Sequence, residues 1–314
     1  MLKRIITNLY EKAIVVNNPY YYYGVPKDEY SKKNGLVALP RIDVVLSEAD
    51  AACVVKGYPY AVKIKEQLGG RFSFSDGKLF LKIDSLTFCV NSSEELFIVY
   101  EVFSLLTYNY SSLRDTVVID VGMNAAITSL FFATNPLVKK IFAYELFSPT
   151  FALAQENLSL NPEYANKIAA FNFGLSDRDF DTKLNYSLSQ KGRMGLKGLP
   201  QNEHFTDVTM QEVTVKDILP VFKGIISACP GMNIVAKIDC EGEEFTLIRR
   251  LAESGFLSKL DVVMIEWHGT NAKEMVDNLI AFHFHVFWSR MPEGDSGMIY
   301  ASRNAEASSL KSEP

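Results

Sequence analysis

Polar side chains follow five short apolar runs in the second part of the chain, and their types could carry out chemistry. Carboxylates accept hydrogen bonds and take up protons, and an imidazole titrates near neutral pH. Ligands of open α/β folds bind at the carboxyl ends of parallel strands, so we expect these side chains to share one site. In chain order, the candidates are Asp120, Gly122 and Asn124; Glu145; Ser176 and Asp177; Asp239 and Glu241; and Glu266 and His268.

The first of these runs, residues 117–130 (VVIDVGMNAAITSL), is typical of a buried strand, a glycine turn and the start of a helix. Gly122 is its only glycine, so the run lacks the GxGxxG pattern that lets a pyrophosphate approach a helix N-terminus. Asp120, just before this glycine, disfavours a phosphate and favours a cationic ligand. A ligand without phosphate that carries ammonium and sulfonium groups, such as S-adenosylmethionine, fits this loop better than a dinucleotide.

Glu145 is the candidate for binding a ribose. It lies 23 residues beyond Gly122, close to the ~20-residue offset at which an acid meets ribose hydroxyls in such folds. A carboxylate can accept two hydrogen bonds from a cis-diol. Taken alone, Glu145 could instead be a solvated residue at a strand end. Its pairing with Gly122 favours the ribose interpretation.

The last two runs end in groups that could act on a second substrate. His268 is the first candidate for a general base, since an unperturbed imidazole has a pKa of ~6.5, and Asp239 is the second. A structural histidine bonded to a backbone carbonyl is an equally weighted alternative for His268. Together with Glu241 and Glu266, these residues could gather a divalent metal. Their sequence spacing does not support one, so we predict a site without metal.

The elements that position these residues alternate from Thr116 onward, which is typical of a parallel sheet covered on both faces. Expected strands are residues 117–121, 140–145, 169–174, 234–239 and 261–267. Expected helices are residues 125–133, 149–160, 243–251 and 272–282. Two final strands, 285–290 and 297–302, are joined by a short turn and should form an antiparallel hairpin. The pattern predicts an α/β, Rossmann-like, mostly parallel sheet that ends in an antiparallel strand.

We expect three regions along the chain. Residues 1–110 lack βα alternation and predict a smaller α+β extension, with a helix, a hairpin at Asp76-Gly77 and a helix after Ser92. Residues 111–304 form the Rossmann-like domain. Within it, residues 177–217 are expected to be a long loop that serves as a lid or binding loop, or is disordered. Residues 305–314 are expected to be a disordered tail.

Bulk composition limits the classes of partner and the cell compartment that we expect for this protein. The formal net charge is -5, which disfavours nucleic acid as the main partner. No apolar run reaches the ~18 residues of a membrane span.

Residues 1–16 are predicted to form an amphipathic helix docked on the body of the protein, with weak membrane-surface contact as the alternative. The four cysteines lack zinc-ligand spacing, which predicts reduced thiols and a cytoplasmic protein. The oligomeric state stays open.

Between about Ser92 and Ser302, the chain resembles the FkbM-type family, a branch of the class I S-adenosylmethionine-dependent methyltransferases. The similar segments are SSEELFIVYEVFSLLTY, VVIDVGMN, IFAYELFSPTFALAQENLSLN, FNFGLSD, VTVKDIL, VAKIDCEGEEFTLIRRL and VVMIEWHG. KIDCEGEE is the most specific, being close to the family's K-I-D-x-E-G-x-E. Met123 and Ala126 depart from the family's D-x-G-A-N-x-G, and Leu146 stands where the family has proline after Glu145.

The resemblance implies S-adenosylmethionine as cofactor and a role for each candidate. Asp120, Gly122 and Asn124 would surround the amino-acid end of the cofactor, and Glu145 would hold the ribose. Ser176 and Asp177 would flank the adenine. Asp239 and Glu241 would face the sulfonium and the acceptor, and Glu266 and His268 would line the acceptor side.

The implied activity is O-methylation of a hydroxyl on a sugar, glycan or natural product, with a small molecule or glycan as acceptor. Two alternatives remain. Met123 and Ala126 favour a catalytically silent binding module that keeps the fold. A nucleotide-cofactor oxidoreductase is disfavoured by the missing GxGxxG pattern and by the terminal hairpin.

Overall fold

The computed structural model describes residues 21–22, 25–26, 29–198, 207–269, 271–291 and 295–303. The chain divides into two compact units, Met1–Thr107 and Tyr108–Pro314. The helix expected over residues 1–16 and the tail expected over residues 305–314 lie outside the described residues. No helix within the described ranges is long and apolar enough to cross a membrane.

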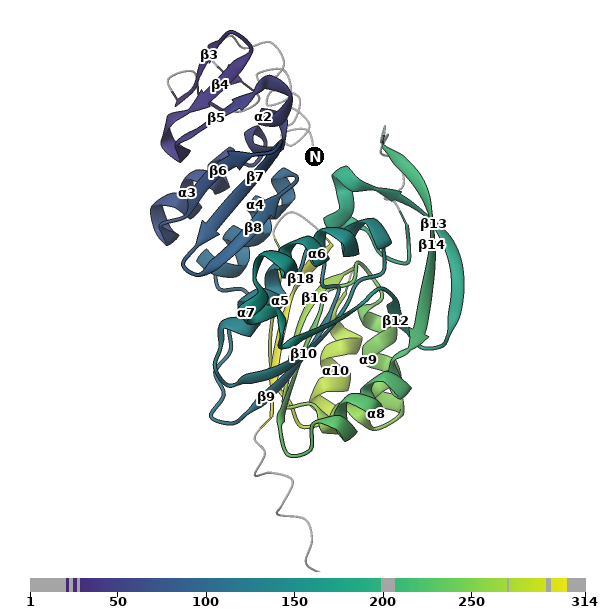
Figure 1. Ribbon diagram of the computed structural model, residues 1–314. Coiled ribbons are helices and arrows are strands. Elements are labelled where there is room, and N and C mark those ends of the chain that lie inside the picture. Colours follow the sequence, from purple (N-terminus) through teal and green to yellow (C-terminus); the bar gives the residue numbers. More distant parts are fainter. Residues whose placement is uncertain are drawn as a thin grey trace, which may run out of the picture. The chain divides into compact units, whose positions relative to one another are not determined.

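The first unit mixes short sheets and helices (Figure 1). Its strands are β1 (Tyr21–Tyr22), β2 (Val25–Pro26), β3 (Ser31–Lys33), β4 (Leu36–Leu39), β5 (Val44–Ser47), β6 (Arg71–Ser75), β7 (Lys78–Ile83) and β8 (Leu86–Val90). Its helical segments are η2 (Pro40–Ile42), α2 (Glu48–Val55), α3 (Tyr58–Leu68), α4 (Ser93–Val99) and the π-helical η3 (Tyr100–Ser104).

Two local predictions in this unit are confirmed. Asp76 and Gly77 both have positive φ, 51° and 72°, as a tight turn between twisted strands requires, and β6 pairs with β7 across them. Helix α4 begins after Ser92, whose Oγ accepts the Glu94 N–H at 3.2 Å. The Glu95 carboxylate in turn accepts the Ser92 N–H at 2.8 Å, which completes a capping box.

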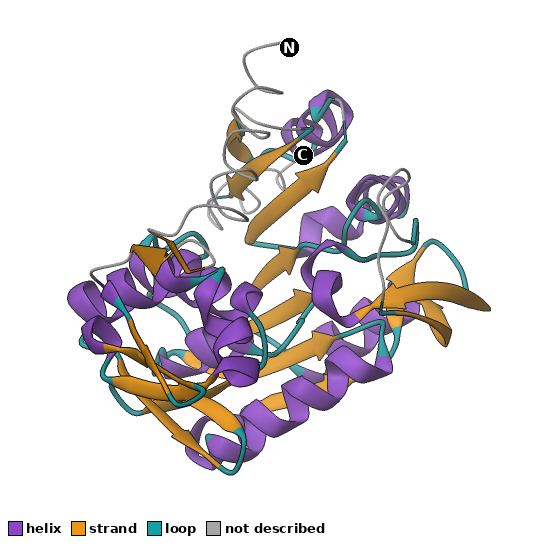
Figure 2. Ribbon diagram, turned by 90° about the horizontal axis from the view of Figure 1, so that it is seen from above, coloured by secondary structure: helices purple, strands orange, loops and turns teal. Residues whose placement is uncertain are grey.

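A seven-stranded sheet forms the second unit (Figures 1 and 2). Its strands are β9 (Thr116–Val121), β10 (Val138–Tyr144), β11 (Ile168–Phe171), β15 (Asn233–Ile238), β16 (Val262–His268), β17 (His285–Arg290) and β18 (Ser296–Ser302). They lie in the order β11-β10-β9-β15-β16-β18-β17. All neighbouring pairs from β11 to β16 are parallel, whereas β18 runs antiparallel to β16 and β17. The predicted Rossmann-like sheet with an antiparallel terminal strand is confirmed.

Helices cover both faces of this sheet (Figure 2). They are α5 (Ile127–Thr134), α6 (Ser148–Leu160), α7 (Pro162–Ala165), α8 (Ile218–Ala228), α9 (Glu244–Glu253), η5 (Phe256–Lys259) and α10 (Lys273–Ala281). Val117, Ile119 and Val121 of β9 pack in one core with buried residues of α8, α9 and α10. Every residue of β9 is buried, which explains why the strand is apolar on both faces except for Thr116 and Asp120.

Residues 177–217 were expected to form a long loop, and this prediction is wrong for much of the segment. Strands β12 (Gly174–Ser176), β13 (Phe180–Ser187) and β14 (Val208–Asp217) form a separate three-stranded sheet, which Figure 1 shows beside the main one. A short 3₁₀ segment, η4 (Leu188–Arg193), follows β13. Polar and apolar residues are interspersed in β13 and β14, so neither strand gives a continuous apolar run. Alternation of Val213 and Val215 with polar residues was the signal for β14.

The turn from β9 into α5 contains two residues with positive φ, a backbone conformation that is unfavourable for most residues with a Cβ atom. Asn124 has φ 51° and Ala126 has φ 63°, both in the left-handed region. Asparagine tolerates this region, but an alanine Cβ crowds the carbonyl oxygen there. Ala126 is fully buried at the N-terminus of α5. The glycine that the family pattern has at this position would therefore relieve strain.

We expect Ala126→Gly to cost less stability than Ala125→Gly. Both alanines are buried, at 0% and 1% exposure, so each change removes one buried methyl group and adds similar freedom to the unfolded chain. Only Ala126 has a positive φ. The difference between the two free energies of unfolding should be about 1–2 kcal/mol, measured by urea denaturation. Equal losses would show that the turn stores no strain.

Candidate active site

A cleft opens at the carboxyl ends of the central strands. Ligand-binding clefts of this fold type lie at that edge, where strand order reverses between β9 and β15. Five residues of the predicted site line it: Gly122, Asn124, Glu145, Asp239 and Glu241. Residues 191, 192 and 194–196, which follow β13, line it too, so part of the segment predicted as a loop does contribute to the cleft.

Gly122 is required by the packing of two strands. Its φ is 82°, and a Cβ added there would lie 1.7 Å from the carbonyl oxygen of Asp239. The end of β9 and the end of β15 thus approach so closely that no other residue fits. This single glycine sets the spacing between the two sides of the cleft.

Glu145 is fixed in the cleft by the backbone. Its Oε2 accepts the Asn124 N–H at 2.9 Å and its Oε1 accepts the Phe147 N–H at 3.0 Å. The residue is 7% exposed, and burial raises the pKa of its carboxyl to about 7 against the opposing effect of the two N–H groups. Each oxygen keeps a further lone pair, so the carboxylate can still accept a hydrogen bond from a ligand hydroxyl.

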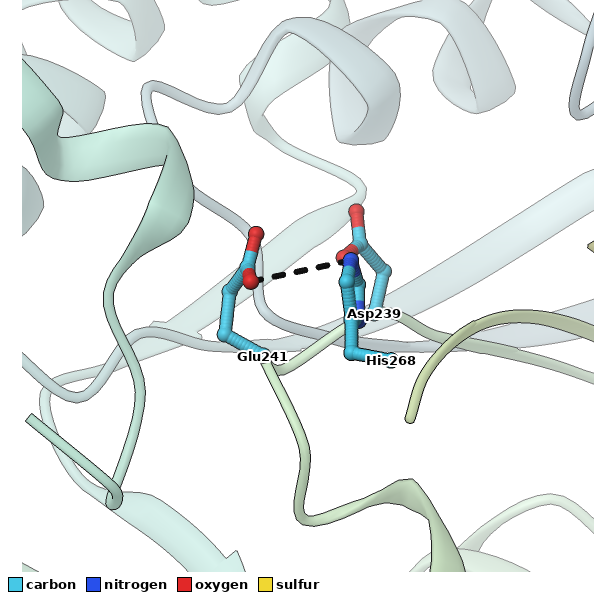
Figure 3. Close-up of side chains that lie close together, drawn as sticks. All are labelled: Asp239, Glu241 and His268. Carbon is cyan, nitrogen blue, oxygen red and sulfur yellow. Dashed lines mark ion pairs between the residues drawn. The ribbon is translucent and has the colours of Figure 1, made fainter. Parts of the chain in front are cut away.

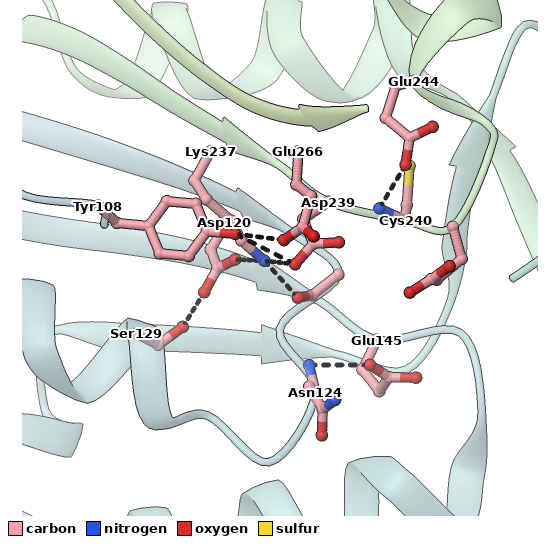
Figure 4. A network of polar contacts seen from close by, with 12 residues as sticks. Tyr108, Asp120, Asn124, Ser129, Glu145, Lys237, Asp239, Cys240, Glu244 and Glu266 are labelled. Atoms are coloured by element: carbon pink, nitrogen blue, oxygen red, sulfur yellow. Dashed lines mark hydrogen bonds and ion pairs between the residues drawn. The ribbon is translucent and has the colours of Figure 1, made fainter. Parts of the chain in front are cut away.

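Lys237, which the sequence analysis left without a role, joins the two strands beneath the cleft (Figure 4). Its Nζ donates to the Gly122 carbonyl oxygen at 2.7 Å and lies 3.3 Å from Asp120 Oδ1 and 3.4 Å from Asp239 Oδ2. Burial alone would lower the pKa of this lysine, but the charges of Asp120 and Asp239 raise it. Lys237 therefore stays charged at neutral pH.

Asp120 faces this lysine and does not line the cleft. It is fully buried, and its Oδ2 accepts the Ser129 hydroxyl of α5 at 2.6 Å. Burial raises the pKa of Asp120, while Lys237 opposes that shift. The cation that Asp120 was expected to meet in a ligand is thus supplied by the protein itself.

Tyr108 is a second residue that the sequence analysis missed. Its hydroxyl lies 3.3 Å from Asp239 Oδ2 and 3.3 Å from Glu266 Oε2, so it can donate to either carboxylate (Figure 4). Its ring lies 5.5 Å from Lys237 Nζ. Tyr108 ends the segment SSEELFIVYEVFSLLTY, but nothing in that segment indicated a role for it in the site, because it precedes the alternating region. Lys237 did leave a signal, as a charge inside an apolar strand and two residues before Asp239.

Three predicted site residues lie close together at the carboxyl ends of β15 and β16 (Figure 3): His268, Glu241 and Asp239. The Nδ1 of His268 lies 3.1 Å from Glu244 Oε1, and its Nε2 lies 3.6 Å from Glu241 Oε2 and 3.8 Å from Glu266 Oε1. Burial lowers the pKa of His268, but the Glu244 hydrogen bond and the charges of Glu241 and Asp239 outweigh it and raise the pKa to about 10.

This environment favours Glu241 over His268 as the group that takes up a proton. A histidine with that pKa keeps its proton at neutral pH, which disfavours His268 as the general base, and the role of His268 stays a prediction. Burial raises the pKa of Glu241 to about 7, although the positive charge of His268 opposes the shift. Glu241 is therefore the group of this cluster whose pKa matches proton uptake near neutrality.

Ser176 and Asp177 stand apart from the cleft lining. The Ser176 hydroxyl donates to Glu243 Oε1 at 2.5 Å, and Glu243 itself lines the cleft. The Asp177 side chain is 43% exposed and lies 3.9 Å from Arg178. Their adenine-flanking role stays a prediction.

Neither departure from the family pattern in the turn narrows the cleft. Met123 is 1% exposed and Ala126 is fully buried, and neither lines the cleft. The two residues that favoured a silent binding module therefore do not obstruct a ligand.

The fold and site define a Rossmann-like α/β protein with an acidic cleft at its strand ends. No protein-family model and no curated protein sequence matches the chain. Solved structures with similar folds include precorrin-6y C5,15-methyltransferase from Geobacter metallireducens, with 12% identity and a TM-score of 0.36 over 65% of this chain and 88% of that chain. M. capricolum TrmK in complex with S-adenosyl-homocysteine has 12% identity and a TM-score of 0.37 over 66% and 68%.

Ribosomal protein L11 methylase from Lactobacillus delbrueckii has 18% identity and a TM-score of 0.34 over 64% of this chain and 76% of that chain. Similarities of this strength carry no argument about ligand or substrate. The fold assignment rests on the observed order and direction of the strands.

We expect Lys237→Met to lower the free energy of unfolding by about 3–5 kcal/mol, because it leaves Asp120 buried without its cation. Adding Asp120→Asn removes the orphaned charge and should recover more than half of the loss. Urea denaturation of the two single variants and the double variant measures the coupling. Additive losses would mean that the pair does not interact.

Proposed function

We propose that the chain is an S-adenosylmethionine-dependent methyltransferase of the class I fold, and that it belongs to the FkbM-type branch. The observation that carries the proposal is the position of Glu145. It is held by two backbone N–H groups beside the Gly122–Asn124 turn, at the end of the strand next to β9. A carboxylate fixed there suits the cis-diol of a ribose.

The charge of the cleft supports a cationic ligand. Among the described residues that line it, four carry carboxyl groups and one carries an ammonium group: Glu145, Asp239, Glu241 and Glu243, against Lys191. A sulfonium and an ammonium are attracted by such a lining, whereas a pyrophosphate is repelled. The single glycine of the turn is also consistent with a ligand that has no phosphate.

Two sides of the cleft would divide the work. Glu145 and the turn around Asn124 would hold the nucleoside, and Asp239 and Glu241 would face the methyl group and the acceptor. As the acceptor oxygen bonds to the methyl carbon, the carbon–sulfur bond breaks and the sulfur leaves as a neutral thioether. Glu241 would take the hydroxyl proton, because the pKa of its carboxyl is about 7. We propose a hydroxyl of a sugar, glycan or natural product as the acceptor.

The affinity for S-adenosylmethionine should rise about tenfold between pH 6 and pH 8. Burial raises the pKa of the Glu145 carboxyl to about 7, and the diol binds its ionised form. Ionisation is nearly complete at pH 8 and falls to about a tenth at pH 6, so affinity is lost as pH falls. Isothermal titration calorimetry at pH 6, 7 and 8 measures this slope.

Glu145→Gln is the matched variant, because it keeps the shape of the side chain and cannot ionise. It should bind more weakly at pH 8 and show a flatter pH profile than the wild type. NAD serves as the control ligand and should give no heat. If S-adenosylmethionine gives no heat with the wild type at any of these pH values, the proposed function is wrong.

A further inference from the structure

Three side chains from two neighbouring strand ends converge in the second unit. Asp239 follows β15, Glu241 lies two residues further on, and His268 ends β16. One ligand atom from each lies within 4.8 Å of the others. Figure 3 shows the Glu241 carboxylate and the His268 ring facing each other, with Asp239 beside them. Donors at this separation need only a small movement to share one ion.

A fourth residue orients the imidazole. Glu244 is fully buried, and its Oε1 lies 3.1 Å from His268 Nδ1 and accepts the N–H groups of Cys240 and Gly242, each at 3.0 Å. His268 Nε2 is thereby directed towards Glu241 and Glu266. Histidines that bind metals usually donate their other ring N–H to such a carboxylate.

The charges around the imidazole are unbalanced. Four carboxyl groups surround it: Asp239, Glu241, Glu244 and Glu266. The nearby Lys237 is shared between Asp120, Asp239 and the Gly122 carbonyl oxygen, and the positive charge of Arg193 acts on Glu241, so the carboxyl groups still outnumber the cations. Glu244 Oε2 is buried and has no hydrogen-bond partner within the described part of the chain. A buried carboxylate oxygen without a donor calls for positive charge nearby.

We propose that Asp239, Glu241 and His268 bind one divalent cation, with Glu244 as the residue that orients the histidine. The ion would displace the proton from His268 Nε2, because a metal binds the neutral form of an imidazole. Carboxylate oxygens suit Mg²⁺ and Mn²⁺, and an imidazole nitrogen suits later metals, so Mn²⁺ matches the mixed set best. Side-chain exposures of 26% for Asp239 and 21% for Glu241 and His268 leave room for water or an acceptor on the ion. The proposal departs from the metal-free site expected from sequence spacing.

The catalytic role of the ion rests on the proposed function: the ion would hold an acceptor hydroxyl and make it more acidic. With the ion bound, Glu241 would be its ligand in place of the proton acceptor, and the proton of the acidified hydroxyl would pass to solvent. Binding of the ion itself requires no methyl donor. The two hypotheses can therefore fail separately.

Electron paramagnetic resonance of Mn²⁺ added to the full-length protein tests the site. Free Mn²⁺ gives a six-line signal. As Mn²⁺ is added, this signal should stay weak until about one Mn²⁺ per chain has been bound, as expected for a single three-ligand centre, and should then grow. Pulsed measurements should show coupling to a ¹⁴N nucleus from the imidazole. Mn²⁺ that stays free, or that binds without nitrogen coupling, would overturn the proposal.

Variants assign the binding to these residues. Asp239→Asn and Glu241→Gln should each weaken Mn²⁺ binding by at least about tenfold, and His268→Gln should abolish the nitrogen coupling. Glu274→Gln is the control, because it removes one charge from an exposed carboxyl group paired with Arg249 on the surface. Circular dichroism checks that each variant is folded. Unchanged binding in folded Asp239→Asn and Glu241→Gln variants would also overturn the proposal.

Discussion

The buried ammonium group of Lys237 is the interaction on which the site depends. It connects the carbonyl oxygen of Gly122 at the end of β9 with the carboxylates of Asp120 and Asp239. Removing the charges of Lys237 and Asp120 from water costs several kcal/mol for each ion, and only close mutual attraction offsets that cost. The two strand ends must therefore keep their spacing. The glycine at 122 permits that spacing, because any Cβ there would collide with Asp239.

Backbone groups and buried carboxyl groups hold the functional side chains from behind. Glu145 is fixed by the N–H groups of Asn124 and Phe147, and His268 is fixed by Glu244. Both side chains therefore have little freedom left to lose when a ligand binds. Such preorganisation lowers the entropic cost of ligand binding, because the side chains are already ordered.

The crowding of carboxyl groups determines which of them exchanges protons. Burial raises the pKa values of Glu145 and Glu241 to about 7, while the surrounding negative charges raise that of His268 to about 10. An imidazole is usually the group that titrates near neutrality, and here it is a glutamate. The same excess of negative charge is what makes a cation, whether a ligand or a metal, a suitable occupant of this edge of the sheet.

By itself the sequence determined the main sheet, because period and length of apolar runs are local properties. It identified the strands that carry Asp120 and Glu266, the strands that end just before Glu145 and Asp239, the terminal hairpin and the start of α4 at Ser92. Strands β13 and β14 escaped prediction because partly polar strands leave only a weak pattern. Only the tertiary structure decided that Lys237 pairs with Asp120, that Tyr108 reaches Asp239 and that His268 keeps its proton. The reason is physical: pKa values and ion pairs depend on burial and on distances between residues far apart in the chain, and the local sequence does not encode these.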